Sequence, residues 1–159
     1  MFKDLPDNLS EVQEKLRHGL ERKSRFEINY VMSSTSLIAC FAGRDFYITD
    51  GNLRPVLAYE ATAYGNAVAI SDSGRYAIFQ TAHNREHDAD SGAFAIIDIK
   101  KREITSKGRI ETGWKGITHL FLDEQEKCFW AYYGDDKARY DFTLKADPET
   151  LKWYTPKRR

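Results

Sequence analysis

Residues 66–99, NAVAISDSGRYAIFQTAHNREHDADSGAFAIIDI, contain three apolar runs that alternate with polar segments. The first two runs, NAVAIS and RYAIFQTA, are separated by a short turn that includes Asp72 and Gly74. Apolar runs of about four to eight residues, bounded by Gly, Asp and Ser, are typical of β-strands. This stretch therefore predicts consecutive antiparallel strands joined by turns.

The same pattern extends over most of the chain. From Arg25 onward, about eleven β-rich runs can be distinguished: FEINYVM, SLIACFA, DFYITD, RPVLAYE, NAVAIS, RYAIFQTA, AFAIIDI, EITSKGRI, ITHLFLD, KCFWAYY and ARYDFTL. The segment THLFLDEQEKCFWAYY repeats the order of NAVAISDSGRYAIFQT, and residues 26–59 can be divided in the same way. The sequence thus predicts three four-stranded units of about 45 residues, with residues 151–154 as the last strand.

The repeated unit resembles a blade of the WD40 or YVTN-type β-propellers, through ISDSGRYAIF and the following SGAFAIIDI. The resemblance covers residues 65–110 best and implies four-stranded antiparallel blades. Closed propellers use about four to eight blades, and three units are fewer. We therefore expect a mainly β fold, an antiparallel meander or sandwich of about eleven short strands. Three propeller-blade-like units are the alternative arrangement.

One helix is expected before the β-domain. Leu9, Val12, Leu16 and Leu20 follow the helical period, and two overlapping capping patterns, Asn8 with Glu11 and Ser10 with Gln13, mark its start. The helix should span residues 8–23 and dock its apolar stripe on the sheet, although a partner-binding helix would have the same pattern. With the β-domain at residues 25–155, the 159 residues form a single domain.

Two strands near the C-terminus differ in how many of their faces are apolar. KCFWAYY is apolar on both faces, with Cys128, Trp130 and Tyr132 opposite Phe129, Ala131 and Tyr133. Such a strand is expected in a sheet that is covered on both sides. ARYDFTL alternates, which predicts one face in contact with water and one directed inward, made of Ala138, Tyr140, Phe142 and Leu144.

The composition limits the functional classes. The chain has 24 Lys and Arg against 24 Asp and Glu, so its balance gives no support to general nucleic-acid or membrane-surface binding. No stretch approaches the roughly 18 apolar residues of a membrane span, and the N-terminus has charges before any apolar run, so a cytoplasmic protein is expected. Cys40 and Cys128 lie in apolar runs and are expected to be free, buried thiols.

The segment HNREHDADSG, residues 83–92, is longer than the equivalent connections of the other two units. Connections that exceed what the geometry needs often carry binding residues. In an up-and-down meander, residues 43–45, 83–92 and 134–136 should share one rim. That rim would be acidic, with Glu86, Asp88, Asp90, Asp135 and Asp136 against Arg44 and Arg85.

An acidic rim attracts a basic protein and accelerates their encounter. One of Tyr132 and Tyr133 is expected to reach the rim as an aromatic anchor. The predicted partner-binding residues are Glu86, His87, Asp88, Asp90, Tyr133, Asp135 and Asp136. Two simpler explanations stay open: turns are rich in Asp for conformational reasons, and the 83–92 segment could be a solvated loop without a role.

Three other site types have weaker support in the sequence. His83 and His87 with the nearby carboxylates suit a divalent metal, but histidines four apart converge reliably only on a helix, so no metal or cofactor is expected. A second cluster combines basic side chains with an aromatic one, as single-stranded nucleic acid requires: Lys100, Lys101, Arg102, Lys107, Arg109, Trp114 and Lys115. The chain has none of the GxSxG, P-loop, GxGxxG and HExxH motifs.

The leading hypothesis is a non-enzymatic protein-binding module with a basic partner. The alternatives are a metal-dependent enzyme centred on residues 83–92 and a nucleic-acid-binding domain that uses residues 100–115. Small β-domains of this size that lack motifs are similar in type to the bacterial immunity proteins, which neutralise a toxin by covering its active site. That similarity implies a toxin as the partner, and the acidic rim implies that its surface is basic.

Overall fold

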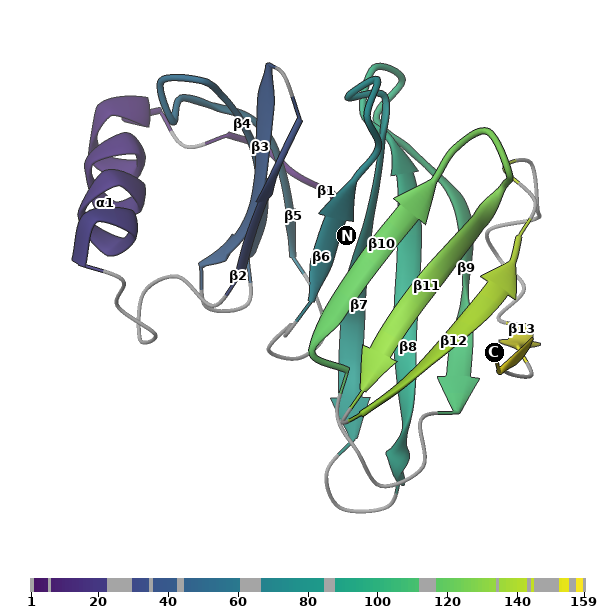
Figure 1. Cartoon of the computed structure of the whole chain (residues 1–159). Coiled ribbons are helices and arrows are strands. Elements are labelled where there is room, and N and C mark those ends of the chain that lie inside the picture. The colour runs from purple at the N-terminus through teal and green to yellow at the C-terminus, as the bar shows by residue number, and fades with distance from the viewer. Residues whose placement is uncertain are drawn as a thin grey trace.

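In the computed structural model the chain is mainly β, as the sequence predicts (Figure 1). The residues that the structure describes are 2–5, 7–22, 30–34, 36–42, 45–60, 67–84, 88–111, 117–133, 135–142, 144, 152–154 and 157–158. These residues form one helix and fourteen strands in three sheets.

The three sheets follow one another along the chain. The first has the order β1-β5-β4-β3-β2, with β1 at Phe2–Lys3, β2 at Tyr30–Ser33, β3 at Leu37–Ala42, β4 at Asp45–Asp50 and β5 at Pro55–Glu60. The second has the order β13-β9-β8-β7-β6, with β6 at Val68–Ile70, β7 at Tyr76–Asn84, β8 at Asp88–Asp98, β9 at Glu103–Glu111 and β13 at Lys152–Tyr154. The third has the order β10-β11-β12-β14, with β10 at His119–Asp123, β11 at Cys128–Tyr133, β12 at Asp136–Asp141 and β14 at Lys157–Arg158.

The eleven predicted runs correspond to β2–β12, and consecutive strands within each sheet pair antiparallel. The prediction for the last strand was wrong. Residues 152–154 form β13, which pairs in parallel with β9 of the second sheet, and the fourth strand of the third sheet is β14. A short apolar run identifies a strand but not its partner, because either exposed sheet edge can supply the hydrogen bonds.

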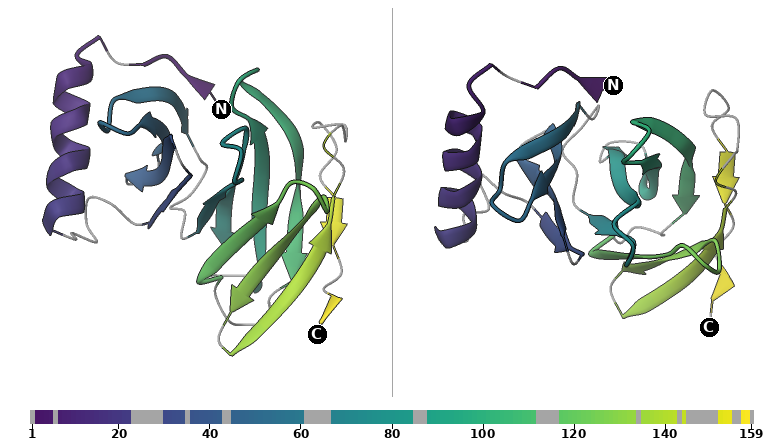
Figure 2. Two further views of the ribbon diagram at one scale, coloured as in Figure 1. Left: turned by 45° about the horizontal axis from the view of Figure 1, so that its top comes forward. Right: turned by 90° about the horizontal axis from the view of Figure 1, so that it is seen from above.

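The sheets are arranged like successive blades, and this is the arrangement observed of the two that the sequence left open (Figure 2). The first strands of the three sheets, β2, β6 and β10, lie next to one another. The second sheet is covered on one face by the first sheet and on the other by the third. A two-layer sandwich would leave no sheet covered by sheets on both faces.

Two apolar cores join the blades. Between the first and second sheets, Phe46 stacks on Phe79 with ring centroids 4.2 Å apart, amid Phe41, Ile48 and Leu57. Between the second and third sheets, Phe129 packs on Phe94 at 4.7 Å and stacks on Tyr140 at 5.1 Å. Face-to-face packing of side chains at this density excludes water from the interior of the fold.

Helix α1, Leu9–Arg22, covers the other face of the first sheet (Figure 1). The N–H of Glu11 donates to Asn8 Oδ1 at 3.2 Å, so of the two predicted capping patterns the one at Asn8 is used. Leu16 is fully buried against Cys40, Ala42, Tyr47 and Ala58, and Val12 is half-buried beside it. The predicted docking of the helix is thus confirmed at Leu16, whereas the Leu20 side chain lies outside the described part.

The third sheet differs from the sequence-based expectation. Its inner face, which includes Leu120, Phe129 and Tyr140, packs on the second sheet. On its other face, here called the outer face, Phe121 is 48% exposed and Tyr132 is 37% exposed. The expected covering of both faces of KCFWAYY is therefore not met by the described residues. The apolar pattern was correctly assigned to a strand. It does not show whether residues of the same chain pack on both faces of that strand.

Both cysteines are free and buried, as the sequence predicts. Within the described part of the chain, no helix has the length and apolarity that crossing a membrane requires.

Candidate protein-binding surfaces

The hairpin between β11 and β12 carries two of the predicted partner-binding residues. Tyr133 pairs with Asp136, so the turn between them is as tight as the sequence predicts. Asp135 and Asp136 are both exposed. The Tyr133 side chain lies outside the described part, so its role as an aromatic anchor stays a prediction.

The connection between β7 and β8 is shorter than predicted. Strand β7 continues to Asn84 and β8 begins at Asp88, with His83 opposite Gly92 and Asn84 opposite Asp88. The expected loop at residues 83–92 is therefore mostly a lengthened, irregular hairpin, because polar residues can pair through their backbones as readily as apolar ones. Glu86 and His87 lie outside the described residues, and Asp88 and Asp90 are placed by backbone alone.

The ends of these two hairpins lie at the same edge of the molecule (Figure 1). We call this edge the acidic rim; its described carboxylate residues are Asp88, Asp90, Asp135 and Asp136, whereas the predicted Glu86 and His87 lie outside the described residues. Residues 43–44, the third predicted contribution, lie outside the described residues, although Asp45 is described. Asp45 accepts hydrogen bonds from the Lys3 ammonium at 3.0 and 3.1 Å, so its charge is paired.

The predicted basic cluster extends over the β8–β9 turn and the length of β9. Lys100, Lys101 and Arg102 are exposed in the turn between β8 and β9. Strand β9 then carries the chain about 26 Å away, at about 3.3 Å per residue, before Trp114 and Lys115, which lie outside the described residues. Lys107 and Arg109, the other members of the cluster, lie on β9 between these groups; Lys107 is half-buried, and the Arg109 side chain lies outside the described part. No group of three or more metal-ligating side chains is found where the structure describes the chain.

Sequence analysis missed the outer face of the third sheet. The register brings Phe121, Trp130 and Arg139 into one cross-strand row, and His119, Tyr132 and Lys137 into the next. The Lys137 ammonium lies 5.2 Å from the centroid of the Trp130 ring, within cation–π range. The signal was present in the sequence, because the alternate residues His119, Phe121, Trp130 and Tyr132 of the two runs are all aromatic.

A third row of the outer face is acidic. It consists of Asp123, Cys128 and Asp141, at the ends of the strands opposite Lys137. Arg139 Nε donates to Asp141 Oδ1 at 3.1 Å, and the Arg139 guanidinium lies 3.8 Å from the Glu126 carboxylate. These bonds raise the pKa of Arg139, and burial raises the pKa of the Cys128 thiol. The Cys128 thiol is therefore protonated and a poor nucleophile at neutral pH.

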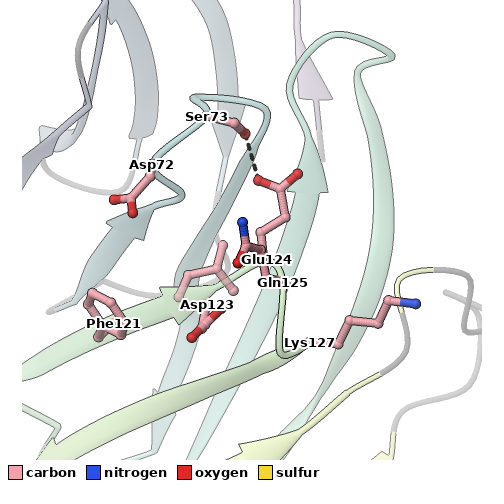
Figure 3. Close-up of a pocket in the computed structure, with 8 residues that line it drawn as sticks. Asp72, Ser73, Phe121, Asp123, Glu124, Gln125 and Lys127 are labelled. Atoms are coloured by element: carbon pink, nitrogen blue, oxygen red, sulfur yellow. Dashed lines mark hydrogen bonds between the residues drawn. The ribbon is translucent and has the colours of Figure 1, made fainter.

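A shallow pocket of about 600 Å³ adjoins the acidic row (Figure 3). It lies between the β6–β7 turn and the β10–β11 turn, and Ser73 Oγ donates to Glu124 Oε2 across it at 2.6 Å. The side chains that line it include Asp72, Ser73, Phe121, Asp123, Glu124 and Lys127. Three carboxylates and one ammonium group line it, so it extends the negative end of the outer face.

Comparison with known proteins places the fold. No family model and no curated protein matches the sequence. The chain is similar to a chain in the crystal structure of the mitotic checkpoint complex, with 11% identity and a TM-score of 0.57 over 82% of this chain and 38% of that one. Kluyveromyces lactis Hsv2 is similar with 13% identity and a TM-score of 0.55, over 83% of this chain and 37% of that one.

Kluyveromyces marxianus Hsv2 gives 17% identity and a TM-score of 0.53, over 83% of this chain and 37% of that one. The chain thus spans well under half the length of the structures that it resembles. At these identities the likeness concerns the fold alone: the chain has the architecture of three successive β-propeller blades. Closed propellers have about four to eight blades, so these three do not form a closed ring.

Proposed function

We propose that this chain is a non-enzymatic protein-binding module that holds a basic partner on its acidic rim. The observation that carries the proposal is the meeting of two separate hairpins at one edge, where Asp135 and Asp136 are exposed. Hairpins rich in Asp and Glu that meet at one edge create a local negative potential even on a chain whose net charge is zero. Such a potential accelerates the encounter with a basic protein.

The blade architecture supports a binding role because it presents hairpins from successive sheets on one edge of a rigid scaffold. The finer form of the proposal is that the partner is a basic toxin, which this chain neutralises as an immunity protein by covering the toxin's active site. The type-level similarity to immunity proteins supports this form. A test is co-expression with the product of the adjacent reading frame, in which an immunity protein would restore growth.

Charge reversal tests the acidic rim itself. Proteins that the wild-type chain captures from a lysate of its source organism would be compared with those captured by the Asp135→Lys/Asp136→Lys variant, at low and at high salt. We expect a basic protein that the wild type retains at low salt and that the variant loses. The matched control is Glu126→Lys, which reverses an exposed carboxylate in a turn at the opposite end of the same sheet.

Binding kinetics measured on the purified chain and its partner would then separate the effect of the aspartates on association from the effect of Tyr133 on dissociation. Reversal of the two aspartates should slow association and reduce its dependence on salt, because exposed charges act mainly on the rate of encounter. Tyr133→Ala should instead speed dissociation, as expected for an aromatic anchor. An association rate that is unchanged by the reversal would contradict the proposal.

A further inference from the structure

The outer face of the third sheet has the chemistry of an interface but has no cover among the described residues. Phe121 and Tyr132 are 48% and 37% exposed, and Trp130 lies half-buried between them in the central strand. Among the described residues, the other sheet faces are packed against a neighbouring element. They are both faces of the second sheet, both faces of the first sheet and the inner face of the third sheet. Figure 1 shows β10, β11 and β12 with no described element in front of them.

The two ends of this face carry charges of opposite sign. One end carries Lys137, and the other carries Asp123 and Asp141, with the aromatic side chains between. Arg139, in the central row, is already paired with Asp141 and Glu126. On β10, β11 and β12 the face carries two basic and two acidic side chains, and β14 adds Lys157, which the register places beside Arg139. Because the opposite ends of β12 carry Lys137 and Asp141, a second copy can place unlike charges in contact.

We propose that two copies of this chain associate through their outer faces, related by a two-fold axis that lies in the interface and runs across the strands. That rotation reverses the strand direction of the second copy while each strand stays opposite its own counterpart. It brings Lys137 of each copy towards Asp141 of the other, and the central rows of Phe121, Trp130 and Arg139 meet on the axis, where each Arg139 keeps its Asp141 and Glu126 partners. Sheets packed in this way lie about 10 Å apart with nearly aligned strands.

Helix α1 decides between this arrangement and a head-to-tail one. In a head-to-tail assembly the outer face of one copy would pack on the free face of the first sheet in the next copy, and repetition would give a ring or a filament. That face is occupied by α1, with Leu16 fully buried against Cys40, Tyr47 and Ala58. Of the sheet faces that the structure describes, the outer face of the third sheet is the one available, so association ends at the dimer.

The area of the outer face determines the expected affinity of the dimer. Four strands about 4.8 Å apart and about five residues long give a projected area of roughly 300 Å² per copy. Stable interfaces bury about 800 Å² per partner. We therefore expect a weak dimer with a Kd of roughly 10–500 μM, which is populated at high concentration and absent at low concentration.

A pair of charge reversals tests the geometry. Lys137→Asp places a second carboxylate opposite Asp141 at both contacts of the two-fold dimer, and Asp141→Lys places a second ammonium opposite Lys137. Each variant alone should raise the dimer Kd by about tenfold or more. In an equimolar mixture, every reversed residue faces an opposite charge, so a heterodimer should form about as well as the wild-type dimer. Sedimentation equilibrium over a range of concentrations measures the wild type, the two variants and the mixture.

Controls show whether a change in dimer affinity arises at the outer face, from unfolding of the variant or at another part of the surface. Circular dichroism and thermal unfolding should show both variants folded, since Lys137 and Asp141 are exposed. Phe121→Ala should weaken the dimer, whereas Val56→Ala, which truncates a comparably exposed apolar side chain on β5, should leave it unchanged. Asp135→Lys should also leave it unchanged, so failure of this proposal and failure of the acidic rim are distinguishable.

Three results would overturn the proposal. The first is a wild-type chain that stays monomeric at submillimolar concentration. The second is self-association of both charge variants with the wild-type Kd, which would place the interface elsewhere. The third is a mixture of the two variants that stays monomeric, which would exclude the two-fold arrangement.

Discussion

Phe129 and Phe121 belong to neighbouring strands of the third sheet but to opposite faces, and this difference determines their roles. Phe129 is fully buried and packs on the rings of Phe94, Tyr140 and Phe142. Phe121 is 48% exposed. Because the cost of truncation depends on how tightly apolar neighbours surround the ring and on the cavity that remains, the same substitution should have different effects at the two positions.

Phe129→Ala is expected to lower the free energy of unfolding by about 3–5 kcal/mol. Phe121→Ala should change it by about 0.5 kcal/mol or less, as is usual for exposed positions. Urea denaturation at low protein concentration, where no dimer contributes, measures both values. Equal losses of stability at the two positions would mean that the assignment of inner and outer faces is incorrect.

Cys40 gives a prediction about alkaline pH. Burial raises the pKa of its thiol to about 12, whereas an unfolded chain has a thiol pKa of about 8.5. Above about pH 8.5 the unfolded state loses this proton while the folded state retains it, so the free energy of unfolding falls as pH rises. The slope for one such group approaches about 1.4 kcal/mol per pH unit until the folded pKa is reached.

Denaturation of the wild type and of Cys40→Ala between about pH 7.5 and 10 separates this contribution. The variant should be less stable at neutral pH but should show a shallower decline. Burial also raises the pKa of Cys128, so part of the decline remains in the variant. Burial raises the pKa of Tyr47 to about 12 as well, the nearby Asp45 adding to the effect, but an unfolded tyrosine ionises only near about pH 10. Parallel declines in the two proteins would contradict the assignment.

At the scale of elements, α1 is held on the first sheet by a small apolar cluster in which Leu16 is the fully buried helix residue. Leu16→Ala is expected to cost about 2–4 kcal/mol, and Asn8→Ala about 1 kcal/mol because the helix cap is removed. Lys15→Ala, at an exposed position of the same helix, is the matched control and should be nearly neutral. Chemical denaturation followed by far-ultraviolet circular dichroism measures the three changes. Retention of full stability by Leu16→Ala would mean that the helix does not depend on the first sheet.

The elements were largely predictable from sequence, and the reasons are local. The runs that became β2–β12 alternate or are fully apolar, and turn residues bound them, so each strand was visible by itself. The helix was visible from the spacing of Leu9, Val12 and Leu16 and from Asn8. The partner of β13 was not visible, because two sheet edges compete for a short strand. Nor was the length of the β7–β8 hairpin, whose polar residues pair through the backbone.

The candidate sites were predictable only in part, for a different reason. Asp135 and Asp136 stand in a tight turn, whose position follows from the strands beside it. The outer face depends on which side of a strand is covered, and the pattern of Cys128, Trp130 and Tyr132 is the same whether a neighbouring blade or a second molecule covers it. Only the three-dimensional arrangement shows that Phe121 and Tyr132 are exposed.

At the scale of the whole molecule, each sheet packs on its neighbours in the chain, as in other repeat architectures. Local unfolding of the second sheet breaks two packing interfaces, whereas local unfolding of the third sheet breaks one. Local opening should therefore be rarest in the second sheet. The number of packing interfaces also distinguishes the free chain from the proposed dimer, because the dimer gives the third sheet a second interface.

Hydrogen exchange read by mass spectrometry tests this order. At low protein concentration, the amides of Ala77–Phe79 and Phe94–Ile97 should exchange more slowly than those of Phe129–Ala131, which lie in a strand with one open face. At submillimolar concentration, protection of Phe129–Ala131 should rise towards that of the second sheet, while protection of the first sheet stays constant. The Lys137→Asp variant should show no such rise. Slow exchange of the third sheet that is independent of concentration would mean that its outer face is not the open end of the fold.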